Sequence, residues 1–467
     1  MSTIHNKMFA EFQDKALFKQ AQEYGFEYLD DVLQRGVFPS EEAINNLEAL
    51  REPLPELSGE GSDIIATLHE VAGPATVAQV GGRYFGMVNG GVIPTALAAR
   101  ELSSYWDQNP ALYAISPAVA TIEDVTQSWL NQLLGLPEHT VAGFVSGTSM
   151  SLLAGLAAAR YRVFQRANWD VNAKGLNGAP PIRILAGREA HGTVLKAVAM
   201  LGLGTDNITW LEVDRQGRII PENLPQLDAS TILILQAGNV NSGSFDFFEQ
   251  LCQQANQANA WVHIDGAFGL WAAGSRLNHL TKGIEKAQSW SVDGHKTLNT
   301  PYDSGLILCS DEEALISALQ MSGAYIQHST DRNTCRDGMY YTPEMSRRAR
   351  AVELWATLKY LGKSGVDELV FGLHQRAQQF AQEISTVTGF TVLNEVVFNQ
   401  VVVVCADDQQ TLNVMQQIQH LRECWVGSSK WQGRTVIRVS VCSWATTVDD
   451  ITRSVASFKA ALALTAE

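Results

Sequence analysis

The sequence predicts an α/β fold built on a parallel or mostly parallel sheet. Between residues 80 and 310, short apolar segments alternate with helical stretches, as in chains whose parallel strands are joined by helices. After residue 340, a long helical pattern precedes two β-rich runs, 396–406 and 435–445. We therefore expect a helical N-terminal arm (1–75), a large domain (76–335) and a small α+β C-terminal domain (336–467).

The strands of the large domain are predicted from apolar runs too short to be helices. They cover residues 144–145, 182–185, 208–213, 232–235, 261–264 and 305–309. Ligands of α/β proteins bind at the carboxyl ends of strands. The polar residues that follow these runs are therefore the first candidates for a functional site.

Composition excludes several classes of partner. A net charge of -15 disfavours nucleic acid and anionic membranes, and no basic run offsets it. The six cysteines form no CxxC pair, so neither a metal site nor a disulfide framework is expected. With no export signal or apolar span visible, we expect a cytoplasmic protein. Charged residues make up only 18%, which favours an oligomer with buried interfaces.

Lys296 is the first candidate for catalysis. It follows His295 in a loop rich in small and polar residues, ahead of the predicted strand at 305–309. A lysine that forms a Schiff base must lie in a partly desolvated pocket that depresses its pKa. The alternative is an ordinary exposed lysine, which this residue alone does not exclude.

Asp265 is the second candidate for the functional site. It ends the apolar run 261–264 and is followed by Gly266 and Ala267. A carboxylate at a strand end can pair with a pyridinium nitrogen and keep it protonated. Taken alone, Asp265 would more often cap a helix or join a salt bridge.

Residues 144–160 have the form of an anion-binding loop. A short strand turns at Gly147 and enters a helix near Ser149, so that free backbone N–H groups and the helix dipole can face an anion. The hydroxyl groups of Thr148 and Ser149 would assist. Such turns are common, so the loop gains weight only from its place upstream of Asp265 and Lys296.

His191 lies between the anion loop and Asp265 in the chain. It follows the predicted strand 182–185 and stands at the start of the next helix. An imidazole there could stack on a planar cofactor ring and assist proton transfer. Taken singly, a residue that begins a helix or lies at an interface is the more common interpretation.

These four signals, in this order, resemble pyridoxal 5'-phosphate (PLP) enzymes of the aspartate aminotransferase fold, fold type I. The resemblance is closest to the group II amino acid decarboxylases. It rests on Asp293-Gly-His-Lys296, Asp265-Gly-Ala267, Ala190-His191, the run 238–246 and Gly82-Arg-Tyr-Phe-Gly86. It extends from about residue 75 to the region of Arg438 and implies a large PLP-binding domain with a seven-stranded type of sheet.

The resemblance also implies roles for individual residues. It implies that Lys296 carries the cofactor as a Schiff base, that Asp265 binds the pyridine nitrogen and that His191 stacks on the ring. The other implied cofactor contacts are Ala267 beneath the ring, Thr148, Ser149 and His295 at the phosphate, and Asn241 in the run 238–246.

Substrate contacts are less well defined. Relatives place a proton-donating tyrosine on a loop, and here Tyr340 and Tyr341 stand slightly out of register, so either residue could donate the proton, or both could be packed aromatics. Tyr84 and Phe85 are candidate pocket walls. Arg438 is a candidate for binding a substrate carboxylate, with a structural ion pair as its alternative.

The predicted function is decarboxylation of an L-amino acid to its amine and CO2. The alternatives are another reaction on the same scaffold, such as transamination or carbon-sulfur cleavage, and an inactive PLP-fold protein that serves in binding. The resemblance further implies a homodimer with an active site shared between subunits.

Overall fold

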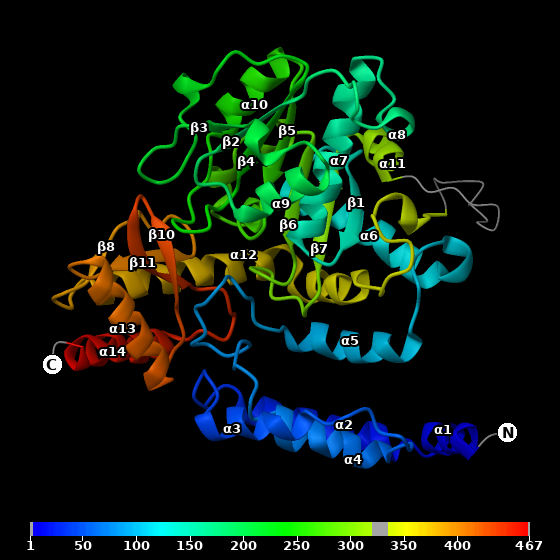
Figure 1. Ribbon diagram of the computed structural model, residues 1–467, viewed down its shortest axis with the longest axis vertical. Helices are drawn as coiled ribbons and strands as arrows, with labels where there is room; N and C mark the ends of the chain where they lie inside the picture. Colours follow the sequence, from blue (N-terminus) through cyan, green and yellow to red (C-terminus); the bar gives the residue numbers. More distant parts are fainter. Residues whose placement is uncertain (1–2, 320–334, 466–467) are drawn as a thin grey trace.

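The computed structural model describes residues 3–319 and 335–465, and it contains two sheets, of seven and four strands (Figure 1). The larger sheet has the order β1-β7-β6-β5-β4-β2-β3. Its strands are β1 (Val141–Val145), β2 (Arg183–Gly187), β3 (Ile208–Leu211), β4 (Thr231–Gln236), β5 (Trp261–Asp265), β6 (Ser289–Asp293) and β7 (Gly305–Cys309).

Strands β2 to β6 run parallel, and β7 runs antiparallel to both β1 and β6. The predicted α/β class with a mostly parallel seven-stranded sheet is confirmed.

Strand β6 was not predicted, because serines and an aspartate interrupt its apolar residues. All five of its residues are buried. Ser289 and Ser291 place their Oγ atoms 2.8 and 3.0 Å from the two ring nitrogens of the buried His263. A neighbouring polar side chain therefore satisfies serines that the sequence pattern alone presents as exposed.

Helices cover both faces of the larger sheet. One face packs against α7 (Thr148–Arg166), α9 (Gly192–Met200) and α11 (Glu312–Leu319), and the other against α6 (Pro117–Leu134), α10 (Phe248–Gln257) and α12 (Ala351–Ile384). The short α8 (Val171–Lys174) follows α7. Two apolar cores therefore hold the sheet between helical layers.

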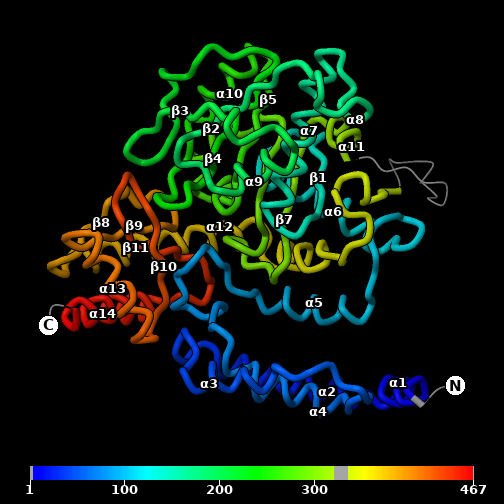
Figure 2. Tube along the Cα trace, viewed as in Figure 1, coloured from blue at the N-terminus to red at the C-terminus, as the bar shows by residue number. Residues whose placement is uncertain are grey.

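The C-terminal unit contains the four-stranded antiparallel sheet, in the order β10-β11-β9-β8. Its elements are β8 (Thr391–Val392), β9 (Gln400–Val404), α13 (Asp408–Leu421), β10 (Gly427–Trp431), β11 (Arg434–Ser440) and α14 (Val448–Leu464). Helix α12 kinks at Gly362, where φ is 58°, and contributes to the cores of both units. Figure 2 shows its path from one unit to the other.

The N-terminal helices lie as a layer beyond α5 (Pro94–Trp106), away from the sheets (Figures 1 and 2). They are α1 (Thr3–Asp14), α2 (Ala16–Asp31), α3 (Glu41–Asn46) and α4 (Gly61–Thr67). Among the helices of the described ranges, none is both long and apolar enough to cross a membrane. The buried cysteines Cys252, Cys309, Cys405, Cys424 and Cys442 form no disulfide bond.

Arg83 joins the end of this arm to the C-terminal unit. It is 3% exposed, and Nη1 lies 3.2 Å from Asp450 Oδ1 at the start of α14. Its guanidinium also donates to the backbone oxygens of Leu33, Gln34, Arg35 and Glu423. One buried cation therefore satisfies carbonyl groups from two distant parts of the chain.

We expect Arg83→Ala to lower the free energy of unfolding by about 3–5 kcal/mol, because it leaves Asp450 and several carbonyl groups without a buried partner. Urea denaturation followed by circular dichroism measures this loss. Arg453→Ala is the matched control, because Arg453 pairs with the same Glu423 at the surface, and it should change stability by less than about 1 kcal/mol. Equal losses in the two variants would contradict the expectation.

Candidate active site

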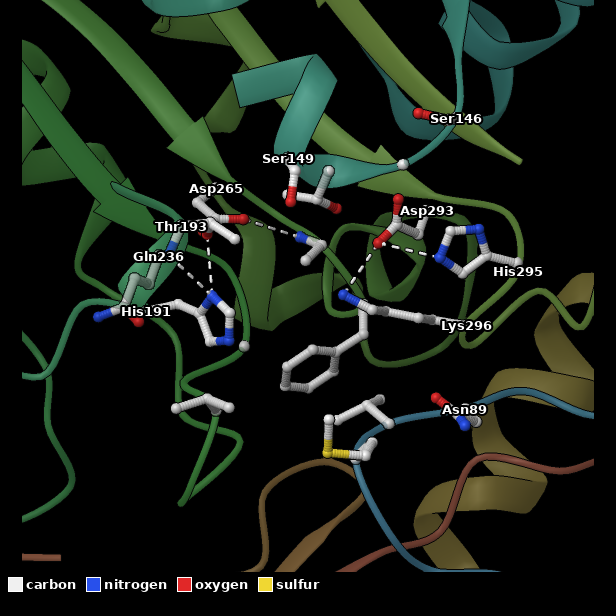
Figure 3. Close-up of a pocket in the computed structure, with 18 of the residues that line it drawn as sticks. Asn89, Ser146, Ser149, His191, Thr193, Gln236, Asp265, Asp293, His295 and Lys296 are labelled. Carbon is white, nitrogen blue, oxygen red and sulfur yellow. Dashed lines mark hydrogen bonds and ion pairs between the residues drawn. The ribbon is translucent and has the colours of Figure 1, made fainter. Parts of the chain in front are cut away.

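A pocket of about 420 Å³ lies at the carboxyl ends of β4, β5 and β6 (Figure 3). The anion loop, the start of α9 and the segment Met87–Asn89 complete its walls, and Arg438 reaches it from β11. Its charged and titratable lining residues are His191, Asp265, Asp293, His295, Lys296 and Arg438. The structure thus brings together residues that are up to 351 positions apart in the chain.

Lys296 projects into the pocket from the loop that follows β6. Its Nζ lies 2.9 Å from Asp293 Oδ2. Burial acts to lower the pKa of Lys296, but the carboxylates of Asp293 and Asp265 outweigh burial and raise it. The expectation of a depressed lysine pKa is therefore wrong for the free site: the amine is held as an ammonium ion.

His295 packs beside this ion pair. Its Nδ1 accepts a hydrogen bond from the Ser304 N–H at 3.1 Å, and its Nε2 lies 3.5 Å from Asp293 Oδ2. The ring also stacks on Tyr302 with 4.2 Å between centroids. Because burial lowers the pKa of His295 and Nδ1 is an acceptor, the ring is neutral and carries its hydrogen on Nε2.

Asp265 ends β5 inside the pocket and is 5% exposed. Its Oδ1 accepts the Ala267 N–H at 3.3 Å. Burial raises the pKa of Asp265, and the nearby His191 and Lys296 offset that rise in part. A cationic ring nitrogen placed here would provide the counter-charge that a buried carboxylate requires.

The anion loop joins β1 to α7. The first helical bonds are those from the Met150 and Ser151 N–H groups to Gly147 O, both 3.0 Å, so the N–H groups of Thr148 and Ser149 precede the helix's own hydrogen bonds. Gly147 packs closely on β7, since a Cβ on Gly305 would lie 2.3 Å from its Cα. The predicted anion loop therefore offers the N–H groups of Thr148 and Ser149 as hydrogen-bond donors, and its turn at Gly147 is held by packing.

His191 is the N-cap of α9 and also lines the pocket. Its Nδ1 accepts the Thr193 N–H at 3.2 Å, and burial lowers the pKa of the ring. His191 therefore begins a helix and lines the pocket, and its stacking on a cofactor ring stays a prediction. A neutral ring with Nδ1 as acceptor presents its remaining hydrogen on Nε2.

The polar atoms of the pocket fit a PLP-sized polar ligand. Within the described residues, three lining side chains have a buried atom without a hydrogen-bond partner: Thr148 Oγ1, Gln236 Nε2 and Asp293 Oδ1. Two of these are donors, as a phosphate ester or a phenolic oxygen requires. With a lysine amine, a buried carboxylate and an anion cradle in one pocket, the residues present fit the cofactor.

Of the implied cofactor contacts Ala267 and Asn241, the first lines the pocket and the second does not. Ala267 lines the pocket as predicted. Asn241 does not line it: its neighbour Val240 does, while Asn241 Nδ2 points to the backbone oxygen of Lys430 at 3.4 Å. A turn held by Asn239 Oδ1, which accepts the Asn241 N–H at 2.9 Å, directs the asparagine away from the pocket.

Tyr84 and Phe85 are not pocket walls, which corrects the sequence-based expectation. Tyr84 stacks on Trp425 with 5.2 Å between ring centroids, and Phe85 is fully buried against Phe380 in the core of the C-terminal unit. A Cβ on Gly86 would overlap Trp425, so residues 82–86 pack against the C-terminal unit. The pocket wall begins with the next residue, Met87.

Tyr340 and Tyr341 also lie outside the pocket of their own chain. They are 4% and 7% exposed and belong to the core beneath α7 and α11. The Tyr341 hydroxyl donates to Glu312 at 2.8 Å, and Arg336 lies 4.1 Å over its ring. Residues 328–334 of the predicted donor loop lie outside the described residues.

Arg438 lines the pocket and has no carboxylate within ion-pair distance among the described residues. Its guanidinium donates to the backbone oxygens of Val240 at 3.1 Å and Met87 at 2.8 Å. These bonds fix its direction without neutralising it. The alternative of a structural ion pair is therefore not seen among the described residues, and the role in binding a substrate carboxylate stays a prediction.

Sequence reasoning missed several lining residues, among them Met87, Asn89, Thr193, Gln236, Phe268 and Asp293. Gln236 and Asp293 could have been found, because each ends a strand next to β5. Asn89 and Phe268 lie in loops without a motif, and only the folded chain brings them to the pocket.

We expect borohydride reduction of the PLP-loaded protein to leave the phosphopyridoxyl group on Lys296, because this lysine lines the pocket and its Nζ lies 2.9 Å from Asp293 Oδ2. Peptide mapping by mass spectrometry identifies the modified residue. Lys296→Ala should remain unlabelled under the same conditions. An adduct on another lysine of the wild-type chain would move the site.

Comparisons with known proteins agree with this geometry. The pyridoxal-dependent decarboxylase conserved domain matches residues 64–405. The acidic amino acid decarboxylase GADL1 of Mus musculus is 28% identical over 324 residues, which cover 67% of this chain and 58% of that protein. The cysteine sulfinic acid decarboxylase of Rattus norvegicus is 26% identical over 325 residues, 67% and 65% of the two chains. Each match thus spans less than two thirds of the relative.

Solved structures show the same fold. The crystal structure of Oryza sativa TDC with PLP and tryptamine has a TM-score of 0.88 at 20% identity and covers 97% of this chain and 98% of that one. Mouse CSAD has a TM-score of 0.86 at 21% identity, with coverage of 96% and 98%. Because the conserved domain matches most of its length, the chain belongs to the pyridoxal-dependent decarboxylase family.

Proposed function

We propose that the protein is a PLP-dependent carboxy-lyase that converts an L-amino acid to its primary amine and CO2. One observation carries the proposal: a single pocket in a chain of this family contains Lys296, the buried Asp265 and Arg438, which has no ion-pair partner among the described residues. Lys296 and Asp265 are the groups that PLP chemistry requires, and Arg438 offers a site for a substrate carboxylate.

Each side of the cofactor has a candidate partner in the pocket. Lys296 would bind it covalently, the N-terminus of α7 with Thr148 and Ser149 would hold the phosphate, and Asp265 would pair with the ring nitrogen. When bound, PLP withdraws electrons from the α-carbon of an attached amino acid. Everything else in the reaction depends on how this chain positions the substrate.

Orientation selects the reaction, because the bond at the α-carbon that stands perpendicular to the cofactor ring is the one that breaks. Arg438, fixed by its two backbone bonds, can hold a carboxylate in one direction. The apolar side chains of Met87, Val88 and Phe268 line the same pocket and disfavour the charge of a carboxylate beside them. The Nε2–H of His191 is a candidate proton donor to the α-carbon.

The names of the relatives suggest which substrates to test. GADL1 and the rat enzyme are named for acidic amino acids and cysteine sulfinic acid, whereas a fold neighbour from Catharanthus roseus was solved with L-tryptophan. A lone guanidinium in the pocket favours substrates with a second acidic group, since it can bind one anion while the other leaves. We therefore rank acidic L-amino acids first.

We also propose a homodimer whose subunits share the active site. The helical arm exposes large apolar side chains, including Phe12 at 69% and Phe26 at 56%. A cavity of about 530 Å³ lies between α2 and α5. A second copy would cover this surface, and it could bring a tyrosine that this pocket lacks to its edge. We further propose a cytoplasmic location, because the buried cysteines Cys252, Cys309, Cys405, Cys424 and Cys442 form no disulfide bond.

Supplying candidate L-amino acids with and without an α-keto acid acceptor distinguishes decarboxylation from transamination. We expect amine and CO2 in equal amounts with no need of the acceptor, and none from Lys296→Ala. Separate assays measure CO2, amine and new amino acid. Acceptor-dependent turnover without CO2 would assign the protein to transamination, and PLP binding without any turnover would favour an inactive binding protein.

Light scattering on the purified protein should give twice the chain mass. Phe12→Glu combined with Phe26→Glu should shift the protein towards monomer, because the two charges would be buried in the interface. Met200→Glu is the matched control: Met200 is 59% exposed at the end of α9, outside the arm, and should leave the mass unchanged. A wild-type monomer that turns over substrate would refute the dimer.

A further inference from the structure

Asn299 is fully buried in the lysine loop, which joins β6 to β7 (residues 294–304). Its backbone lies in the left-handed region, with a φ of 58°, which asparagine tolerates better than most residues. Its Nδ2 donates to the backbone oxygens of Lys296 at 3.3 Å and Thr297 at 2.8 Å. Its backbone N–H also donates to Lys296 O, at 2.9 Å. Asn299 therefore closes the turn that carries the lysine.

The same residue binds two other parts of the chain. Its Oδ1 accepts the N–H groups of Gly91 at 2.6 Å and Trp444 at 2.9 Å, and its Nδ2 donates to Cys442 O at 3.0 Å. Its backbone oxygen accepts the Ile93 N–H at 3.0 Å. One asparagine therefore joins the lysine loop to the segment that follows Met87–Asn89 and to the segment that follows β11.

The two joined segments lead to side chains that line the pocket. Asn89 precedes the first segment and lies below Lys296 in Figure 3. Arg438 on β11 precedes the second segment and lines the same pocket. If Lys296 moved relative to these residues, hydrogen bonds of Asn299 would break in the interior, where an unsatisfied polar group is costly.

We propose that Asn299 is a positioning residue, which fixes Lys296 relative to the pocket wall. An amine reacts with a carbonyl group efficiently only when the reacting atoms are held about 3–3.5 Å apart in the correct orientation. The turn that Asn299 closes directs the lysine side chain, and its other bonds set the distance from Asn89 and Arg438. This role rests on the proposed function, since it requires PLP on Lys296.

Two probes separate the position of the lysine from the shape of the pocket. PLP condenses with the Lys296 amine through its aldehyde and releases water. Pyridoxamine 5'-phosphate has the same ring and phosphate but an amine in place of the aldehyde, so it cannot attach to the lysine. The ratio of the two affinities therefore isolates the contribution of Lys296.

Asn299→Gly is the test variant, because glycine adopts a φ of 58° without strain and makes no side-chain hydrogen bond. Calorimetric titration of the apo protein measures both affinities. We expect about tenfold weaker binding of PLP and less than about twofold change for pyridoxamine 5'-phosphate, a coupling of the size found between residues in contact. Equal losses for both probes would mean that Asn299 only maintains the pocket, and they would overturn the inference, as would unchanged affinities.

Asn394→Ala is the matched control. Asn394 is 8% exposed and also joins the two units, since its Nδ2 donates to Ser242 O and its Oδ1 accepts the Val402 N–H, both at 2.9 Å. Within the described part of the chain, its side-chain hydrogen bonds do not reach the lysine loop. The control should keep the wild-type ratio of affinities within about twofold. The same change of ratio as in Asn299→Gly would contradict the inference.

Hydrogen exchange in the wild-type chain covers the case in which Asn299→Gly does not fold. The N–H groups of Gly91, Ile93 and Trp444 all have Asn299 as their acceptor, so their exchange reports on its bonds. We expect PLP to slow this exchange at least about threefold more than pyridoxamine 5'-phosphate does. Equal exchange with the two probes overturns the inference. Failure of the wild-type protein to bind PLP would instead refute the proposed function, and with it this role.

Discussion

The parallel pairing of β4, β5 and β6 is the constraint on which the site depends. Parallel strands bring their carboxyl ends to one edge of the sheet, and the register pairs Gln236 with Asp265 and Asp265 with Ser291. Asp293 is the last residue of β6, and Lys296 lies in the loop that follows it. The acidic, amide and amine groups of the pocket therefore lie within one short stretch of sheet edge, although the chain separates them by helices.

Contacts between the large domain and the C-terminal unit supply the pocket walls that the sheet edge does not. The segment after the N-terminal arm packs directly on the lysine loop, since a Cβ on Gly90 would lie 2.1 Å from Lys296 O. Arg438 then spans the entrance by donating to Met87 O and Val240 O. The buried Arg83 anchors the same segment to α14. The pocket wall formed by Met87, Val88 and Asn89 thus depends on how the two units pack together.

Electrostatics in the pocket follow from how its charges are paired. Lys296 and Asp293 neutralise one another, while Asp265 and Arg438 lie in the same pocket and form no ion pair within the described part of the chain. An unpaired charge with little access to water is costly, so charged groups of a ligand would be favoured beside the buried Asp265 and the half-buried Arg438. A cationic ring nitrogen for Asp265 and a carboxylate for Arg438 would relieve both costs together.

The sequence by itself determined the chemistry that lies next to strand ends. Apolar runs predicted the sheet, and Asp265, Lys296 and the anion loop were recognisable because strand, turn and residue type are all local in the chain. It could not show that Ser289 and Ser291 are buried in β6, because their partner His263 lies on another strand.

Only the tertiary structure decided which residues of the recognised motifs face the pocket. Trp425 and Phe380 draw Tyr84 and Phe85 into packing, and Glu312 holds Tyr341 in a core. The raised pKa of Lys296 likewise depends on carboxylates whose distance no spacing in the chain specifies. Side-chain direction and pairing are set by neighbours distant in sequence, because burial and electrostatic energy depend on separation in space.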